Sequence, residues 1–396
     1  MKEVLGDIDR WRADGRQVAV ARVVGVEGSG PRDPGATMAV SEDGEVAGSV
    51  SGGCVEGAVV TAALEALGDG NPALCTFGYS DDQAFAVGLT CGGTIHVLVD
   101  PKLPDFYQDF EDAVAAEEPV ALATVIEVDA APSGDNGAAS PGSPDAAGTT
   151  TRLGMTLLVR PGKAPRGSVG DPNLERVVVR DALAALESGL SATRHYGFHG
   201  EANERGVGVF IEAFAPPPRM VIFGAVDFTA ALAKVAKILG YRVTVCDARP
   251  IFATRARFPM ADEVVVDWPQ RYLEQAGGEL GPRDAVCVLT HDPKFDVPAI
   301  TAALETRVGY LGAMGSRRTH ADRSARLREA GVDEEGLRRV MGPIGLDIGA
   351  RSPEETAVSI CAEIISLRTG RREPSSLRDR EGPIHLDREM AASERG

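Results

Sequence analysis

Residues 49–56, Ser-Val-Ser-Gly-Gly-Cys-Val-Glu, are matched by residues 168–175, Ser-Val-Gly-Asp-Pro-Asn-Leu-Glu. At the same spacing, Gly-Ala-Thr-Met-Ala-Val at 35–40 matches Gly-Met-Thr-Leu-Leu-Val at 154–159. In both copies a helical segment of about a dozen residues follows, and then alternating, strand-like segments. Similarity that persists at one fixed spacing indicates an internal duplication.

The duplication organises residues 1–213 into one domain. We expect two related α+β halves, at about 17–100 and 119–213, each with strands around one helix and with glycine or proline turns between them. The second copy carries an extra stretch at 132–151 that consists almost wholly of Ala, Pro, Ser, Gly, Asp and Thr. Such a composition buries too little apolar surface to fold, so we expect a flexible surface loop there.

The two copies differ at their cysteines. Gly-Gly-Cys at 52–54 becomes Asp-Pro-Asn at 171–173, and Cys-Gly-Gly at 91–93 becomes Glu-Arg-Gly at 204–206. The second copy therefore keeps the predicted scaffold while lacking both thiols.

Cys54 is the first candidate for a reactive or metal-binding group. The helix after it is expected to begin near Val55, and a helix N-terminus favours a thiolate over a thiol. Flanking glycines let a ligand approach the backbone, and the N–H groups of the turn are suited to an anion such as a phosphate. The alternative is a tight turn in which the glycines serve the backbone and the cysteine only packs. The sequence leaves both interpretations open, for Cys91 as for Cys54.

A second domain is predicted after the proline-rich linker at 213–218. Over 219–372 apolar strands alternate with helices, including one expected at 298–305 and one at 317–330. This alternation predicts a Rossmann-like, doubly wound parallel sheet, so the chain as a whole is an α/β protein. The remaining residues, 373–396, are expected to form a flexible tail.

The last helix of this domain is the best delimited one. Ser352 is expected as its N-cap, Pro353 follows in the first turn, and Glu355 completes a capping box. Gly370 is expected just past its end.

Half of a dinucleotide-binding pattern is present in the second domain. Gly224 follows the first strand and Asp247 stands where an acid would bind a ribose. However, Val226 occupies the place of the second glycine, so its side chain would obstruct a pyrophosphate. A second place suited to an anion is Gly-Ser-Arg-Arg at 315–318, at a strand-to-helix turn. A solvated helix start is the alternative there.

Composition excludes several classes of protein. The formal net charge is −17 and the pI about 4.9, which argues against binding to nucleic acid or to an anionic membrane surface. We find no signal-peptide pattern and no apolar run long enough to span a bilayer, so we expect a cytoplasmic protein. The cysteines show neither a disulfide framework nor a zinc pattern. Four are expected in the core: Cys75, Cys246, Cys287 and Cys361.

Together these segments closely resemble the XdhC/CoxI family of accessory proteins for xanthine dehydrogenase and carbon monoxide dehydrogenase. The resemblance covers nearly the whole chain. It is carried by residues 28–40, 48–57, 89–100, 221–225, 241–259, 289–300, 310–318 and 342–360.

The resemblance implies a cofactor-handling function. Members of the family bind the molybdenum cofactor (molybdopterin), hold it while a cysteine desulfurase supplies a terminal sulfur, and insert it into an apo molybdenum hydroxylase. A homodimer is also implied, and Cys54 would be a contact to molybdenum. The candidate cofactor-binding residues are Gly52, Gly53, Cys54, Glu56, Cys91, Gly92, Gly93, Gly224, Asp247, Gly315, Ser316, Arg317 and Arg318.

Two other functions remain open. An NAD(P)-dependent oxidoreductase is suggested by the strand-helix alternation, but Val226 argues against binding of NAD(P). His291, beside Asp292, is the best candidate for proton transfer, with a structural histidine as the alternative. A docking scaffold without a cofactor is the other rival. We therefore favour a maturation factor over an enzyme and assign no catalytic residue.

Overall fold

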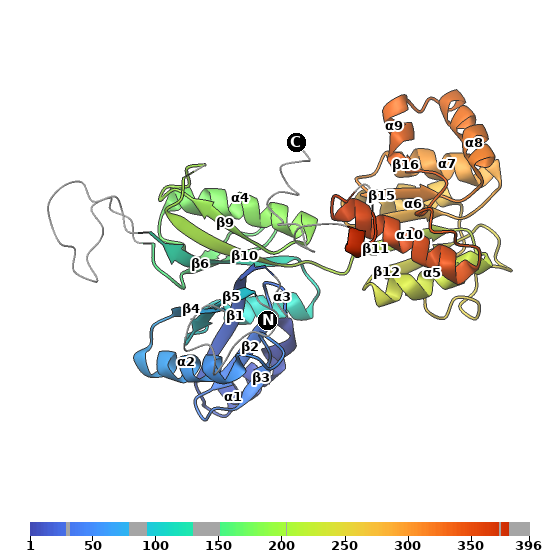
Figure 1. The fold of residues 1–396 in the computed structure, drawn as a ribbon. Coiled ribbons are helices and arrows are strands. Elements are labelled where there is room, and N and C mark those ends of the chain that lie inside the picture. The colour runs from blue at the N-terminus through green and yellow to red at the C-terminus, as the bar shows by residue number, and fades with distance from the viewer. Residues whose placement is uncertain (29–31, 79–92, 130–150, 203, 372–373, 380–396) are drawn as a thin grey trace. The chain divides into compact units, whose positions relative to one another are not determined.

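The computed structural model describes residues 1–28, 32–78, 93–129, 151–202, 204–371 and 374–379. The chain divides after Pro216 into an N-terminal unit and a C-terminal unit (Figure 1). The expected flexible loop lies outside the described residues except for Thr151, and so does most of the expected tail. Within the described residues, no helix is both long enough and apolar enough to span a bilayer.

The first half of the N-terminal unit contains a five-stranded antiparallel sheet. Its elements are η1 (Lys2–Val4), α1 (Leu5–Ala13), β1 (Val18–Glu27), β2 (Thr37–Ser41), β3 (Val46–Gly48), α2 (Glu56–Asp69), β4 (Ala73–Phe77) and β5 (Thr94–Asp100). The strand order is β3-β2-β1-β5-β4. α2 covers one face of this sheet, where Val50, Val55 and Val59 are fully buried.

The second half repeats this arrangement. Its elements are α3 (Tyr107–Ala115), β6 (Val120–Val128), β7 (Thr156–Val159), β8 (Arg166–Gly167), α4 (Pro172–Ser188), β9 (Ala192–Tyr196) and β10 (Val207–Phe214). The order β8-β7-β6-β10-β9 is the order of the first sheet, element by element. The prediction of two related α+β halves is confirmed.

Two glycines show how far the duplication extends into backbone detail. Gly48 and Gly167 end β3 and β8, and both have a positive φ, of 77° and 88°. A Cβ would lie 2.3 Å from the carbonyl oxygen of Thr37 at the first position and 2.2 Å from that of Thr156 at the second. Only glycine therefore fits at either place, and the sequence match there has a steric cause.

Each half also begins with a helix that we did not expect. α1 precedes β1 as α3 precedes β6, so each repeat is longer than the predicted 17–100 and 119–213. The two helices belong to one core between the halves, which includes Trp11 from α1 and Phe110 from α3. A second small cluster, with Val24 from the first half and Phe210 from the second, completes this contact. The halves thus pack together through the sheet faces opposite α2 and α4.

The C-terminal unit is a six-stranded parallel sheet. Its strands are β11 (Arg219–Phe223), β12 (Arg242–Cys246), β13 (Glu263–Val265), β14 (Ala285–Val288), β15 (Tyr310–Ala313) and β16 (Val340–Met341). Their order is β13-β12-β11-β14-β15-β16, and every pairing is parallel. The predicted doubly wound sheet is confirmed.

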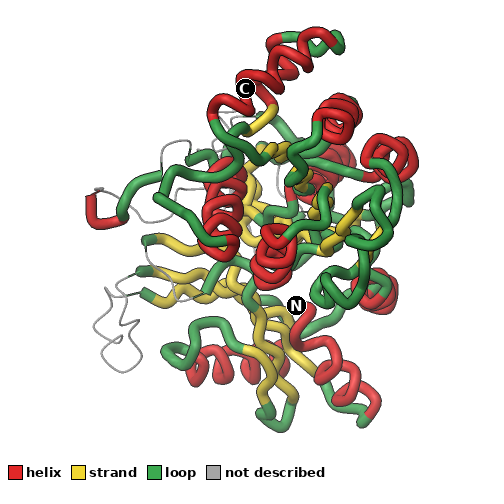
Figure 2. Tube along the Cα trace, turned by 90° about the vertical axis from the view of Figure 1, so that its right-hand side faces the viewer, coloured by secondary structure: helices red, strands yellow, loops and turns green. Residues whose placement is uncertain are grey.

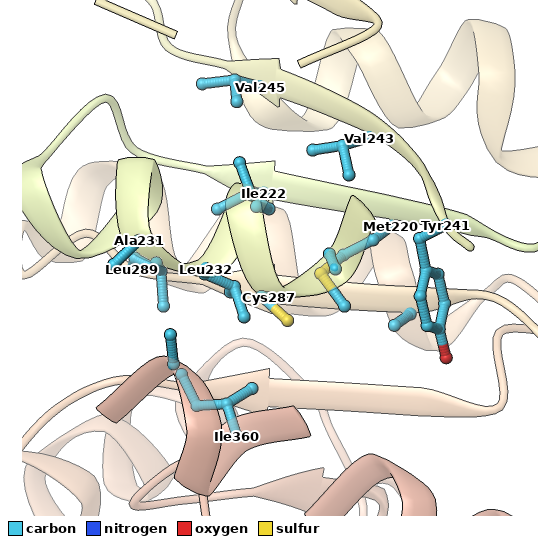
Figure 3. Close-up of a cluster of buried hydrophobic side chains, with 14 of the residues drawn as sticks. Met220, Ile222, Ala231, Leu232, Tyr241, Val243, Val245, Cys287, Leu289 and Ile360 are labelled. Carbon is cyan, nitrogen blue, oxygen red and sulfur yellow. The ribbon is translucent and has the colours of Figure 1, made fainter. Parts of the chain in front are cut away.

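Helices cover both faces of this sheet (Figure 2). They are α5 (Asp227–Ile238), α6 (Pro269–Ala276), α7 (Pro293–Leu304), α8 (Arg317–Glu329), α9 (Glu334–Arg339) and α10 (Pro353–Arg368). Alternate residues of β11 point to opposite faces. Ile222 joins the core under α5 and α10, which contains Leu232 and Ile360 (Figure 3), whereas Phe223 joins the core under α7, which contains Ile300.

The helix predictions in this unit were partly right. Ser352 caps α10 within a capping box completed by Glu355, and Gly370 follows the helix with φ 78°, as predicted. α7 starts earlier than the expected residue 298, because Asp292 caps it and Pro298 is tolerated inside the helix. The short helices α6 and α9 were not expected.

Candidate functional site

The Gly-Gly-Cys turn replaces the first turn of a helix. In the second half α4 starts at Pro172, and the carboxylate of its N-cap Asp171 accepts hydrogen bonds from two backbone N–H groups. In the first half the matching helix α2 starts only at Glu56, as its predicted start near Val55 anticipated. The residues between form a loop in which Gly52 and Gly53 have φ values of 77° and 117°. A non-glycine residue would be strained at both positions, so this loop requires its glycines.

Glu56 holds this loop in shape. Its Oε1 accepts hydrogen bonds from Ser49 Oγ at 2.6 Å and Ser51 N at 2.9 Å. Its Oε2 accepts from Ser51 Oγ at 2.5 Å, Gly53 N at 2.9 Å and Val55 N at 3.2 Å. Burial alone would raise the pKa of Glu56, but the hydrogen bonds from Ser49 and Ser51 outweigh it and lower the pKa to about 2.

These contacts correct one of our expectations. The N–H of Gly52 donates to Ser49 Oγ at 2.8 Å, and those of Cys54 and Val55 donate to Ser51 Oγ at 3.0 Å. The donors that we expected to hold a phosphate therefore already have acceptors inside the loop. A carboxylate at the centre of the loop also repels an anion. The structure thus gives Glu56 the role of anchor for the turn, and makes a phosphate contact of the turn's own N–H groups unfavourable.

Cys54 is the chemically available group of this turn. Its thiol is unpaired and half-buried, and on one side it packs against the core under α2. Gly93 is buried immediately before β5, whereas Cys91 and Gly92 lie outside the described residues. Among the described residues, no cluster of three or more His, Cys, Asp or Glu side chains is arranged to hold a metal ion.

Three of the other described cysteines are core residues as predicted, whereas Cys75 is only half-buried and packs against the core under α2. Cys246, Cys287 and Cys361 are buried, and burial raises the pKa of Cys246 to about 12 and that of Cys361 to about 11. Burial also raises the pKa of Cys287 and of the half-buried Cys75. Thiols of this kind are inert near neutral pH, as the core prediction requires.

In the C-terminal unit, the acid expected to bind a ribose is already engaged. Asp247 is buried, and its carboxylate accepts hydrogen bonds from Ala225 N at 2.8 Å and from the backbone N and Nε of Arg249, both at 2.9 Å. Arg249 Nη2 donates to Oδ2 at 2.8 Å. Burial would raise the pKa of Asp247, but Arg249 lowers it. The carboxylate therefore fixes the turn after Gly224 and offers no ready acceptor to a ribose.

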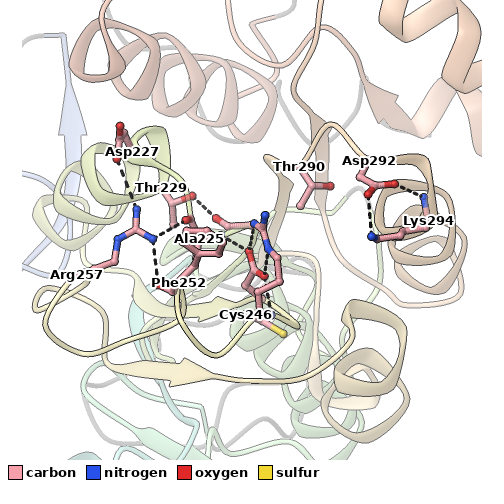
Figure 4. Close-up of polar contacts among 12 residues, drawn as sticks. Ala225, Asp227, Thr229, Cys246, Phe252, Arg257, Thr290, Asp292 and Lys294 are labelled. Atoms are coloured by element: carbon pink, nitrogen blue, oxygen red, sulfur yellow. Dashed lines mark hydrogen bonds and ion pairs between the residues drawn. The ribbon is translucent and has the colours of Figure 1, made fainter.

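A second arginine, Arg257, contacts the remaining residues of the turn after Gly224 (Figure 4). Arg257 Nη1 donates to the Ala225 carbonyl at 3.1 Å, and Nη2 lies 3.7 Å from Asp227. Its guanidinium and that of Arg249 both stack on Phe252, at 5.5 and 4.6 Å from the ring centre. Val226 is the N-cap of α5, with an extended backbone. This edge of the sheet is thus occupied by the chain's own side chains.

A buried arginine hydrogen-bonds to the backbone just before the Gly-Ser-Arg-Arg turn at 315–318. Ser316 caps α8, and Arg317 is exposed beside Asp347, with 3.6 Å between Nη2 and Oδ2. Below the turn, Arg323 is buried and donates to the Met314 carbonyl at 2.7 Å.

Arg323 links this turn to the turn after Gly224. Its Nη2 also donates to Asp296 Oδ2 at 2.9 Å, and Asp296 in turn accepts a hydrogen bond from the hydroxyl of Thr290. The Thr290 methyl lies 2.9 Å from the place of a Cβ on Gly224. Arg323, Asp296 and Thr290 therefore form one buried chain of contacts from the Gly-Ser-Arg-Arg turn to the surroundings of Gly224.

His291 lacks the setting of a catalytic base. The residue is exposed at the end of β14, and the neighbouring carboxylate of Asp292 caps α7 by accepting from Lys294 N at 3.1 Å (Figure 4). Asp292 also pairs with Lys294 Nζ at 3.1 Å. Neither contact orients the imidazole for proton transfer.

Two family models match the chain in different parts. The model described as the XdhC and CoxI family matches residues 11–78 and 145–197, and the model described as the XdhC Rossmann domain matches residues 220–364. The chain belongs to the XdhC/CoxI family.

Relatives of this XdhC/CoxI chain span both of its units. A protein of Bacillus subtilis (strain 168), named as a probable xanthine dehydrogenase subunit, is 29% identical over 367 residues, which are 91% of this chain and 96% of the relative. The molybdenum cofactor insertion chaperone PaoD of Escherichia coli (strain K12) is 26% identical over 363 residues, 92% and 87% of the two chains. A crystal structure described as a xanthine dehydrogenase from Bacillus halodurans matches with a TM-score of 0.63 and 25% identity, covering 95% and 98%.

Several residues around the sites of this XdhC/CoxI chain were not anticipated. The Ser51 hydroxyl accepts hydrogen bonds from two N–H groups of the Gly-Gly-Cys loop. A single serine in such a loop forms no sequence pattern from which this role could be predicted. Arg249 and Arg257 both lie in the segment 247–257. The available signals were that Arg249 follows Asp247 by two residues and that Arg257 directly precedes an aromatic residue. Asp296 and Arg323 are distant in sequence, so only the fold pairs them.

Proposed function

We propose that this chain binds the molybdenum cofactor, supports its sulfuration and inserts it into an apo molybdenum hydroxylase of the xanthine dehydrogenase type. Family membership supports a maturation role, as does the similarity to PaoD, whose name is that of an insertion chaperone. The cofactor is a cargo in this proposal and not a resident group. Its molybdenum centre supplies the oxidative chemistry of the client, so no reaction on an organic substrate is required of the chain itself.

The observation that carries the proposal is the Gly-Gly-Cys turn at 52–54. In the second half, which has the same fold, helix α4 runs through the corresponding position, where Asn173 stands in place of Cys54. The first half instead has two glycines at positive φ, a conformation that other residues rarely adopt, and presents a half-buried, unpaired thiol beside a helix start. A thiolate is a soft ligand that suits molybdenum.

A small number of protein ligands to the metal suits a carrier better than a permanent holder. A carrier must release its cargo to the client, and release is faster when few bonds hold the metal. We propose Cys91 as a second thiol of the same region, because its Cys-Gly-Gly context is confined to the first copy. A cysteine desulfurase as sulfur donor, a homodimeric assembly and a cytoplasmic location complete the proposal.

The oxidoreductase alternative has less support. A nicotinamide dinucleotide needs an acceptor for its ribose and a glycine-lined approach for its pyrophosphate. Asp247 already accepts hydrogen bonds from Ala225 and Arg249, and the side chain of Val226 stands at the start of α5. We therefore assign the C-terminal unit no dinucleotide chemistry in this proposal.

The test is cofactor retention and client activation. The chain is purified from a host that makes molybdopterin, and molybdenum and pterin contents are measured for wild type, Cys54→Ser and Cys361→Ser. Each preparation is then mixed with apo hydroxylase and the activity recovered is followed. We expect Cys54→Ser to fold normally, with a stability change within about 1 kcal/mol, and to lose most molybdenum and most activation. The core variant Cys361→Ser is the matched control for loss of a thiol.

Each outcome separates the alternatives. Wild-type behaviour of Cys54→Ser in both assays would remove the thiol from the mechanism. Wild type that retains no cofactor, yet binds the apo hydroxylase, would favour the docking scaffold.

A further inference from the structure

Helix α10 carries apolar side chains on both of its long sides. Its inner side, with Ile360 and Ile364, is buried in the core of the C-terminal unit. Its outer side carries Val358, Ala362 and Ile365, whose spacing of four and then three residues places them on one face of the helix. A surface helix of a soluble domain is typically polar on the side away from its core. The outer stripe of α10, formed by residues 358, 362 and 365, therefore requires a separate explanation.

The outer stripe is accessible and has an apolar neighbour. Val358 is 50% and Ile365 is 38% exposed, and Ala362 between them is half-buried. Helix α5 packs beside α10 in the same core and ends at Ile238, which is 83% exposed. Exposed apolar side chains gathered on two neighbouring helices are typical of a contact with another protein.

The charges of α10 are divided between its two ends. Glu354 and Glu355 lie in the first turn and Arg368 in the last. The Glu355 carboxylate completes the capping box, but the side chains of Glu354 and Arg368 make no ion pair within the described part of the chain. Glu354 precedes Val358 by one helical turn and Arg368 follows Ile365 by one. The outer stripe is therefore flanked by an acidic end and a basic end.

This arrangement is complementary to itself. When a second α10 lies antiparallel on the first, Val358 of one copy meets Ile365 of the other, and the two-fold axis passes beside Ala362. The small side chain near the axis lets the two helices approach closely. Glu354 of one copy then faces the last turn of the other, which carries Arg368. A parallel arrangement would instead bring like charges together at both ends.

We propose that a second copy of this chain docks on the outer face of α10, and that the two α10 helices pack antiparallel about a two-fold axis. The inference names the contact face of the homodimeric assembly described above, and it therefore rests on the proposed function. With α5 beside each α10, the contact contains two helices from each copy, and apolar side chains exposed in the single chain become buried. Each contact occurs twice, so one substitution changes the interface at two places.

The test is the monomer–dimer equilibrium of the full chain, measured by sedimentation equilibrium. A contact of two helices per copy is at the small end of specific interfaces, so we expect a dissociation constant of about 10 µM. Ile365→Glu places a carboxylate in both copies of the outer stripe and is expected to weaken association by about a hundredfold. Ile251→Glu is the matched control, because Ile251 is 76% exposed in the same unit but lies outside both helices.

Charge reversal tests the antiparallel orientation. Glu354→Arg and Arg368→Glu are each expected to weaken the dimer by about tenfold, because the new side chain faces a like charge in the second copy. The two substitutions combined in one chain give opposite charges at both places again, and are expected to restore the wild-type dissociation constant. A mixture of the two single variants is expected to form a heterodimer in native mass spectrometry, since each variant supplies the charge that the other lacks.

Three results would overturn the proposal. The first is a wild type that is monomeric at about 100 µM, well above the expected dissociation constant, as when another segment of the chain covers the outer stripe. The second is a dimer that Ile365→Glu leaves intact. The third is a combined charge-reversal variant that does not recover association. Should Ile365→Glu fail to fold, the charge-reversal set decides the matter, because Glu354 and Arg368 are both exposed.

Molybdenum content separates this inference from the carrier function. A wild type that retains molybdenum, with Ile365→Glu still dimeric, contradicts only the assigned face. A wild type that dimerises through this face but retains no molybdenum contradicts only the carrier function. A monomeric wild type whose Ile365→Glu variant no longer activates the apo hydroxylase assigns the outer stripe to the client and overturns the proposal.

Discussion

Replacement of Glu56 by glutamine tests whether one carboxylate holds the Gly-Gly-Cys turn. An amide nitrogen in place of Oε2 cannot accept the hydrogen bonds now donated by Ser51 Oγ, Gly53 N and Val55 N. Each hydrogen bond to a charged group contributes about 1.5 kcal/mol or more when buried, but water replaces part of it in a half-exposed loop. We therefore expect Glu56→Gln to lower the free energy of unfolding of the N-terminal unit by about 2 kcal/mol.

The matching glutamate of the second half serves as the control variant, and a buried tryptophan serves as the fluorescent probe of unfolding. Glu175 occupies the matching place in the second half and accepts hydrogen bonds from Ser168 Oγ and Val169 N through one oxygen only, so Glu175→Gln is expected to cost about 1 kcal/mol or less. Urea unfolding is followed by the fluorescence of Trp11, which is buried in the N-terminal unit, with Trp268→Phe as the common background.

The same variant is expected to loosen the turn around the thiol. Alkylation of Cys54 by iodoacetamide, followed by mass spectrometry of the native protein, is expected to be about tenfold faster in Glu56→Gln than in Glu175→Gln, because local opening exposes the sulfur. Equal stability losses in the two variants, with equal alkylation rates, would refute the anchoring role of Glu56.

Acid stability, nucleotide binding and the exposed arginine pair can each be tested separately. Because the pKa of Glu56 is lowered to about 2 from the 4.5 of an unperturbed glutamate, the stability that it contributes is present above about pH 4.5 and is lost as the pH falls towards 2, so acid unfolding of Glu56→Gln is expected to be less steep. NAD(H) at about millimolar concentration is expected to leave the Tm unchanged in a thermal shift assay, since Val226 and Arg249 occupy its place, and a rise of several degrees would contradict this. Arg317→Ala combined with Arg318→Ala is expected to leave the Tm nearly unchanged while weakening cofactor retention, and unchanged retention would make the pair ordinary surface.

The fold could be predicted because its signals are periodic and local. Matched glycines such as Gly48 and Gly167 are required by the same steric contact in both copies, so the duplication can be recognised from the sequence alone. The capping box at Ser352 is equally local. α1 and α3 were missed because the two helices are short, and their apolar side chains are buried only where the two halves meet.

The candidate sites were less predictable, because their contacts are set by the fold. Cys54 and its glycines could be singled out by comparing the two copies. That Glu56 bonds to its own loop, and that Asp247 is engaged by Arg249, depends on side-chain directions that spacing does not fix.

The connections between the first two strands of each half, β1 to β2 and β6 to β7, differ in length. In the first half, the loop from β1 to β2 carries Gly35 and Ala36 on the wall of an open pocket. In the second half, β6 and β7 have the corresponding places in an identical strand order, and the sequence between them contains the long insertion at 132–151. An insertion between these two strands interrupts neither of them. The connection from β6 to β7 is consequently the natural position for a reporter domain or an affinity tag, whereas the same addition between β1 and β2 would obstruct the pocket.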